Sequence, residues 1–231
     1  MSFEVGNRLI VPLDVPTLSE ADALVATLAG AASWMKIGLE LYTAEGPEAV
    51  RCISATGASI MLDLKLHDIP ATVAGAMRRV AALGVGLVTV HAGGGRQMLE
   101  AAVAAAGDTR VLAVTVLTSM DADNLREVGV AAAPRDAVLL RAQLAIEAGC
   151  HGVVASPLEA AAIREIAPAG FLIVTPGVRP SGADVGDQKR VMTPAQARAA
   201  GADMVVVGRP IRSAADPAAA ARAVVAELGD Q

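Results

Sequence analysis

Aromatic residues are almost absent from this chain. Phe, Trp and Tyr together make up 2% of the 231 residues, whereas hydrophobic residues as a whole make up 54%. The interior must therefore be built from small and branched aliphatic side chains, which suits a parallel sheet covered by helices. The length is close to the roughly 250 residues of a (β/α)8 barrel and short for two α/β domains, so we expect one domain over residues 1–231.

Runs of basic residues and long apolar runs are also missing. The net charge of -5 and the pI near 5.2 argue against a surface for nucleic acid or an anionic membrane. Charged residues, Gly or Pro interrupt every apolar stretch before the ~18 residues that a membrane span needs. The first seven residues contain no apolar segment of a signal peptide. We therefore expect a cytoplasmic protein that acts on a small molecule.

Cysteine and histidine are too few and too scattered for a typical metal site. Cys52 and Cys150 each lie in an Ala/Ile-rich segment, and we predict that both are buried free thiols. The three histidines, His67, His91 and His151, have neither His-x-His nor His-x-x-x-His spacing. The sequence therefore predicts neither a metal nor a cofactor.

Short β-branched runs alternate with Ala-rich stretches from end to end, a pattern typical of repeated βα units and a parallel sheet. Eight strands are predicted, over residues 8–14, 34–38, 59–65, 86–91, 110–117, 152–156, 171–176 and 203–208. Helices are predicted between them, over residues 20–28, 47–55, 72–83, 96–106, 135–148 and 157–166. Eight units without a linker favour closure into a (β/α)8 TIM barrel. An open doubly wound sheet is the alternative, because a count of strands does not show closure.

A charged run ends the third predicted strand, where residues 63–68 read Asp-Leu-Lys-Leu-His-Asp. Because side chains alternate along a strand, Asp63 and Lys65 should both point into the barrel mouth. Asp68 follows in the loop, close enough to add a second carboxylate beside the Lys65 ammonium. An ammonium held between two anions stays protonated, which suits a reaction that forms a carbanion and then protonates it, such as decarboxylation. The alternative is an ion-pair network that only closes the barrel top.

The loops after the seventh and eighth predicted strands contain Gly and Arg. Residues 176–180 read Pro-Gly-Val-Arg-Pro and residues 207–211 read Val-Gly-Arg-Pro-Ile. In a barrel of this type, these two loops and a short helix that opens there form the usual phosphate site. Backbone N–H groups at the helix start attract an anion, and Arg209 can add a charge-assisted contact. We therefore expect a phosphorylated substrate, although a Gly-Arg-Pro turn with a solvated arginine is the alternative.

With these residues identified, the chain closely resembles the orotidine 5′-phosphate decarboxylases of the bacterial type. The matching motifs are Val11-Pro12-Leu13-Asp14, Lys36-Ile37-Gly38, residues 63–72, Val116-Leu117-Thr118-Ser119, Pro176-Gly177-Val178-Arg179, Gly186-Asp187-Gln188 and residues 207–211. The resemblance implies that orotidine 5′-monophosphate (OMP) loses CO2 to give UMP in de novo pyrimidine synthesis, without a metal or a cofactor. It also implies that Lys65 delivers the proton to the pyrimidine carbon and that Asp63 lies near the departing carboxylate.

The same resemblance implies how the substrate is held. Asp14 and Lys36 would hold the ribose, and Thr118 would lie along the nucleotide. Four residues would surround the phosphate: Arg179, Gln188, Gly208 and Arg209. The family is also expected to form a homodimer in which three residues reach into the neighbouring subunit's site: Asp68, Ile69 and Thr72. Residues 182–189, rich in Gly and Asp, are expected to close over the site as a lid.

Two other functions are compatible with parts of this pattern. The Asp-x-Lys-x-x-Asp element is shared with Mg-dependent sugar-phosphate decarboxylases and aldolases, which carry an acidic metal ligand near the end of strand two. Lys36 occupies that region here and disfavours a cation, although Glu40 follows four residues later. A non-catalytic nucleotide-binding protein is the third possibility. The Asp63/Lys65 pair argues against it, because a binder gains nothing from a carboxylate opposite an anionic substrate.

Overall fold

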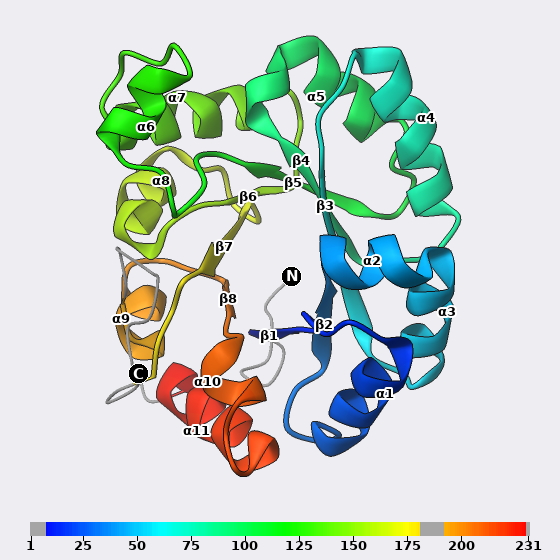
Figure 1. Cartoon of the computed structure of the whole chain (residues 1–231). Coiled ribbons are helices and arrows are strands. Elements are labelled where there is room, and N and C mark those ends of the chain that lie inside the picture. The colour runs from blue at the N-terminus through cyan, green and yellow to red at the C-terminus, as the bar shows by residue number, and fades with distance from the viewer. Residues whose placement is uncertain (1–7, 181–191, 230–231) are drawn as a thin grey trace.

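Eight parallel strands close into a barrel, and helices surround it on the outside (Figure 1). The structure is a computed structural model that describes residues 8–180 and 192–229. The strands are β1 (Leu9–Pro12), β2 (Trp34–Ile37), β3 (Ser59–Leu66), β4 (Leu87–His91), β5 (Arg110–Val114), β6 (Gly152–Val154), β7 (Leu172–Pro176) and β8 (Met204–Val206). The prediction of a (β/α)8 barrel is confirmed, and the open sheet is wrong.

Closure follows from the pairing of the first strand with the last. Ile10 of β1 is opposite Trp34 of β2 on one side and Val206 of β8 on the other. All eight pairs are parallel, so the carboxyl ends of all strands meet at one end of the barrel. Most strands are shorter than predicted, because the chain leaves the hydrogen-bonded ladder where the βα loops begin. Only β3 extends beyond its predicted range, by one residue.

The helices predicted from the sequence are present with small shifts of their ends. They are α1 (Leu18–Thr27), α3 (Pro47–Ala55), α4 (Pro70–Ala81), α5 (Gly95–Ala104), α7 (Pro134–Glu147) and α8 (Ala160–Ile166). The short 3-10 helices η2 (Ala92–Gly94) and η3 (Pro157–Glu159) directly precede α5 and α8. Additional helices are α2 (Leu39–Glu45), α6 (Ala122–Glu127), α9 (Pro194–Ala199), α10 (Arg209–Arg212) and α11 (Pro217–Gly229). None of the helices in the described residues is long and apolar enough to cross a membrane.

Two apolar layers hold the barrel together, one inside it and one between the sheet and the helices. The alternation of β7 shows the division, since Leu172 and Val174 belong to the inner cluster and Ile173 to the outer one. The inner cluster is aliphatic apart from the half-buried Trp34, as the composition predicted. A side chain at Gly86, just before β4, would place its Cβ 2.7 Å from the Trp34 ring, so this ring needs a glycine at that position.

Candidate active site

A cavity of about 250 Å³ opens at the carboxyl ends of the strands. Lys36 of β2 and Asp63 and Lys65 of β3 line one side of it, and Thr118 and Ser119, from the loop after β5, line another. Aliphatic side chains from the ends of β5, β6 and β8 complete the wall. In (β/α)8 barrels this is the catalytic end. The prediction that Asp63 and Lys65 both point into the barrel mouth is confirmed, and Lys36 lies there with them.

Four charged side chains of alternating sign form a continuous chain across the mouth of the barrel. The Lys36 Nζ lies 3.2 Å from Asp14 Oδ1 and 3.4 Å from Asp63 Oδ2. The Lys65 Nζ lies 2.8 Å from the same Asp63 Oδ2. Because β1, β2 and β3 are neighbours in the barrel, side chains at or just beyond the ends of these three strands lie within reach of one another. The Asp63–Lys65 pair predicted from the sequence is present, and the array extends it by Lys36 and Asp14.

Asp63 is the most buried member of this array, with 7% of its surface exposed. Burial by itself would raise the pKa of the Asp63 carboxyl. The opposing effects prevail, because the ammonium groups of Lys36 and Lys65 and the hydrogen bonds from Lys65 and Thr89 together hold the pKa below its usual value. Asp63 is therefore a carboxylate at neutral pH, fixed between two cations.

Lys65 reaches Asp63 through an unusual backbone conformation. Its φ is 51°, and it is the only residue other than glycine with a positive φ among those described. The pairing of β3 with β4 shifts register between Leu62 and Leu66, on either side of it. The regular strand alternation assumed in the sequence analysis is therefore wrong at Lys65. A left-handed conformation costs a non-glycine residue about 1–3 kcal/mol, and such conformations cluster at functional sites.

Asp68 does not lie where its spacing from Lys65 suggested. It is exposed, and its Oδ1 accepts a hydrogen bond from the Ile69 N–H. Within the described part of the chain, the Lys65 ammonium pairs with Asp63 and has no ion pair with Asp68. The expectation of a second carboxylate beside Lys65 in the same subunit is therefore wrong. Asp68 lies in the loop between β3 and α4 and is not among the residues that line the cavity. Ile69 and Thr72 are exposed with it.

The two glycine-arginine loops follow neighbouring strands at the same end of the barrel. Gly177 has φ 77°, which a glycine adopts at little cost, and Arg179 two residues later is buried and donates from Nη1 to the Val178 carbonyl at 3.1 Å. Arg209 is the first residue of α10 and is exposed. A Cβ at Gly208 would lie 2.9 Å from Pro12, so the turn packs directly on the end of β1. The short helix predicted after strand eight is confirmed.

Two sequence predictions lie outside the described residues. Gln188, which the resemblance places at the phosphate, is one of them, and the lid over residues 182–189 is the other.

Thr89 on β4 is a site residue that the sequence analysis missed. Its hydroxyl donates to Asp63 Oδ1 at 2.9 Å and accepts from the Lys65 N–H at 2.9 Å. The signal in the sequence was a hydroxyl side chain inside the apolar run of residues 87–90. That signal is weak, since a threonine is ordinary in any strand.

His91, at the end of β4, is half-buried and its ring centroid lies 5.4 Å from that of His67. Burial lowers the pKa of His91, and the neighbouring His67, Lys65 and Arg141 side chains lower it further. By the alternation of β4, in which Leu87 belongs to the inner cluster and Val88 and Val90 to the outer one, His91 is on the inner side of the strand.

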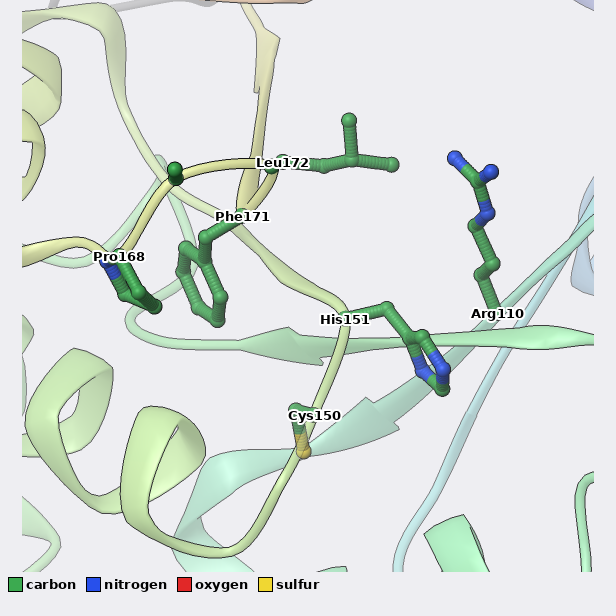
Figure 2. A pocket seen from close by; sticks show the side chains of 8 residues that line it. Arg110, Cys150, His151, Pro168, Phe171 and Leu172 are labelled. Carbon is green, nitrogen blue, oxygen red and sulfur yellow. The ribbon is translucent and has the colours of Figure 1, made fainter. Parts of the chain in front are cut away.

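A second cavity, of about 310 Å³, lies at the opposite end of the barrel (Figure 2). Its lining includes Arg110, His151 and Phe171, which lie at or just before the starts of β5, β6 and β7. His151 Nδ1 accepts from the Val111 N–H at 3.1 Å, so one ring nitrogen is committed to the strand. Side chains at this end of a (β/α)8 barrel serve stability, and we therefore place the active site in the first cavity.

Both cysteines are free thiols, as predicted. Cys150, which lines the second cavity, is buried, and burial raises the pKa of its thiol to about 12. The prediction of burial is wrong for Cys52, which is half-buried on α3 and donates to Glu48 at 3.3 Å.

Metal-binding donors are not gathered in the parts of the chain that the structure describes. No group of three or more His, Cys, Asp or Glu side chains there is arranged to hold an ion. Glu40, the acidic residue considered as a metal ligand, is exposed in the first turn of α2. The end of β2 instead supplies the Lys36 ammonium to the array.

The closed barrel and its buried charge array at the catalytic end define an enzyme of the (β/α)8-barrel class. Residues 7–224 match the orotidine 5′-phosphate decarboxylase / HUMPS family. The chain is 57% identical over 232 residues to orotidine 5′-phosphate decarboxylase of Halorhodospira halophila, with 99% of this chain and 98% of that protein covered. It is 55% identical over 224 residues to that of Anaeromyxobacter sp. (strain K), covering 96% and 99%. The chain belongs to the orotidine 5′-phosphate decarboxylase / HUMPS family.

A solved structure supports the same assignment. The crystal structure of orotidine 5′-phosphate decarboxylase from Lactobacillus acidophilus superimposes with a TM-score of 0.86 at 36% sequence identity, covering 96% of this chain and 99% of that one. The agreement extends over nearly the whole of both chains, so it includes the strand ends that form the active site.

Proposed function

We propose that this protein decarboxylates OMP to UMP and CO2. The observation that carries the proposal is the array Asp14–Lys36–Asp63–Lys65 at the mouth of the barrel, in a chain that matches the family along nearly its full length. The array offers a fixed ammonium beside a fixed carboxylate, which is what the formation and protonation of a carbanion requires. No comparable observation supports the alternative, a Mg-dependent sugar-phosphate decarboxylase or aldolase.

The reaction proceeds at the pyrimidine carbon that bears the carboxylate. The bond from this carbon to the carboxylate breaks, and its electron pair stays on the ring carbon while CO2 leaves. The Lys65 ammonium stabilises the developing carbanion, then donates a proton to the same carbon, and the resulting amine regains a proton from solvent. Asp63 holds the ammonium in place, since their polar atoms are 2.8 Å apart before substrate arrives, so little reorganisation is needed.

The remaining predicted residues bind parts of the substrate away from the reacting carbon. Asp14 and Lys36 hold the ribose, and Thr118, which lines the cavity, lies along the nucleotide. The phosphate is bound by residues of the loops after β7 and β8: Arg179, Gln188, Gly208 and Arg209. Binding energy at the phosphate can offset the cost of placing the substrate carboxylate against Asp63.

We also infer a cytoplasmic homodimer in which each subunit completes the other's site. The inference rests on the exposed segment at the start of α4, where Asp68 and Thr72 flank Ile69, whose side chain is 65% exposed. Burial of this isoleucine against a second copy would remove its apolar surface from water. In that arrangement Asp68 would serve the partner's Lys65, which explains why it lies apart from the Lys65 of its own chain.

The proposed activity is tested by incubating the purified protein with OMP and following its ultraviolet absorbance, with UMP identified by chromatography. We expect conversion to UMP at the same rate with and without a chelator. Loss of activity with the chelator, restored by Mg²⁺, would favour the metal-dependent alternative. Tight binding of OMP without conversion would indicate a nucleotide-binding protein.

The shared site is tested by mixing two inactive variants, Lys65→Ala and Asp68→Ala, after partial unfolding and refolding to exchange subunits. If Asp68 acts across the dimer, each mixed dimer has one site with both native residues. Half of the dimers are mixed, so about one quarter of wild-type activity returns. Each variant refolded alone is the control. No recovery in the mixture, although size measurements show a dimer, would place Asp68 in the site of its own subunit.

A further inference from the structure

One buried hydroxyl joins both members of the catalytic pair. Thr89 is fully buried on β4, adjacent to the strand that carries Asp63 and Lys65. Its Oγ1 donates to Asp63 Oδ1 at 2.9 Å and accepts from the Lys65 N–H, also at 2.9 Å. The hydroxyl therefore uses its donor on the carboxylate and one acceptor position on the lysine backbone.

The bond to Asp63 sets the orientation of the carboxylate. With Oδ1 bonded to Thr89, Oδ2 is the oxygen that faces both ammonium groups, at 2.8 Å from Lys65 and 3.4 Å from Lys36. A rotation of the carboxylate about its terminal torsion would break all three contacts together. Such torsions are broad when nothing holds them, so the hydroxyl supplies an orientation that the side chain lacks by itself.

The bond to Lys65 stabilises a backbone conformation that lysine rarely adopts. At φ 51° the residue interrupts the regular ladder between β3 and β4. An N–H group in such a place needs a partner, because a donor that is buried without one loses its hydrogen bond to water. The Thr89 oxygen replaces the missing ladder acceptor and thereby keeps the Lys65 backbone where its ammonium can reach Asp63.

We propose that Thr89 is a positioning residue for decarboxylation, whose single hydroxyl fixes the Asp63 carboxylate and the Lys65 backbone relative to each other. The proposal rests on the proposed function, since its main readout is the rate of that reaction. Thr89 acts through Asp63 and Lys65. Its removal should therefore lower kcat with little effect on KM, because the phosphate-binding residues are untouched and Lys36 is still held by Asp14.

The pH profile separates this role from simple packing. Asp63 is surrounded by Lys36 from β2, Lys65 from its own strand and Thr89 from β4, with Asp14 beyond Lys36 and His91 two residues after Thr89. The Thr89 hydrogen bond is one of the contributions that lower the pKa of Asp63. Without it the pKa of Asp63 rises, so the acidic limb of the kcat profile moves to higher pH. Loss of packing alone would not move that limb.

The test compares Thr89→Val, which keeps the shape and removes the hydroxyl, with Thr89→Ser, which keeps the hydroxyl. We expect Thr89→Val to lower kcat about 10- to 100-fold, the range for a hydrogen bond to a charged group, with KM within about twofold of wild type. Its acidic limb should move to higher pH. Thr89→Ser should retain kcat within about threefold of wild type and keep the wild-type limb.

Thr175→Val is the matched control. Thr175 is likewise a fully buried strand threonine, and its Oγ1 has no hydrogen-bond partner in the described residues. It lies on β7 and, by the alternation of that strand, faces the helices. The same substitution there should leave kcat, KM and the pH profile unchanged, which shows that loss of a buried hydroxyl alone has no effect.

Wild-type kcat and an unmoved limb in Thr89→Val would overturn the proposal, and so would equal losses in the Val and Ser variants. If Thr89→Val does not fold, as thermal denaturation would show, the comparison of Thr89→Ala with Thr89→Ser replaces it, since both lose a methyl group and only one keeps the hydroxyl. An inactive wild type would instead refute the proposed function. The two failures are therefore distinguishable.

Discussion

Replacing Lys65 by alanine is expected to lower kcat for OMP by about 10⁴-fold or more. The substitution removes the proton donor, whose contribution is typically about 10²–10⁴-fold, and the positive charge beside the carbanion, which contributes a further ~10²–10³-fold. It also leaves the buried Asp63 carboxylate with one ammonium, Lys36, instead of two. The measurement is the rate of UMP formation at saturating OMP, with thermal denaturation to show that the variant is folded.

A second variant separates charge from proton transfer. Lys65→Arg keeps a positive charge, but a guanidinium with a pKa above about 12 is a poor acid at neutral pH. We expect it to remain severely impaired, though less than the alanine variant, because part of the electrostatic stabilisation is retained. Near wild-type rates in either variant would contradict the assignment of Lys65 as the proton donor.

Replacing Arg209 by alanine is expected to lower kcat/KM by about 10²–10³-fold, or roughly 3–4 kcal/mol. Arg209 begins α10 on the loop after β8, where the side chain is exposed and able to meet a phosphate arriving from solvent. A charge-assisted, bidentate contact to a phosphate is stronger than a neutral hydrogen bond, and energy gained there favours the transition state as well as binding. Steady-state kinetics with OMP measures the effect.

Arg212→Ala is the control for this change. Arg212 is on the same short helix, three residues later, and is half-buried. Its removal alters the net charge by the same amount, so a general electrostatic effect on an anionic substrate would appear in both variants. We expect kcat/KM of Arg212→Ala to stay within about threefold of wild type. Equal losses in both variants, or a near wild-type value for Arg209→Ala, would remove Arg209 from the phosphate site.

The barrel could be predicted from the sequence because its signals are local and repeated. Each strand is a short β-branched run, and each is separated from the next by an Ala-rich segment with helical length. Short helices such as α2 and α6 lack that signal, since seven and six residues are too few for a periodic pattern. The catalytic end was predictable for the same reason as the strands, because charged residues follow apolar runs at Lys36 and Asp63.

The details of the site depend on contacts between strands, which a single sequence does not display. The backbone of Lys65 departs from regular strand geometry, and its N–H is bonded by Thr89, 24 residues away. Asp68 falls in the exposed loop between the end of β3 and the start of α4. For Asp68, spacing along the chain suggested a contact with Lys65 that the structure does not make. For Thr89, spacing gave no sign of the contact with Lys65 that the structure does make.

The most direct test of the central claim uses OMP labelled in its carboxyl carbon. With wild-type protein, we expect one labelled CO2 for each UMP formed, at a rate unaffected by a chelator. With Lys65→Ala, folded and still able to bind UMP, label release should fall to the background level. Release of label by Lys65→Ala at the wild-type rate would contradict the claim that the Asp63–Lys65 pair carries out the decarboxylation.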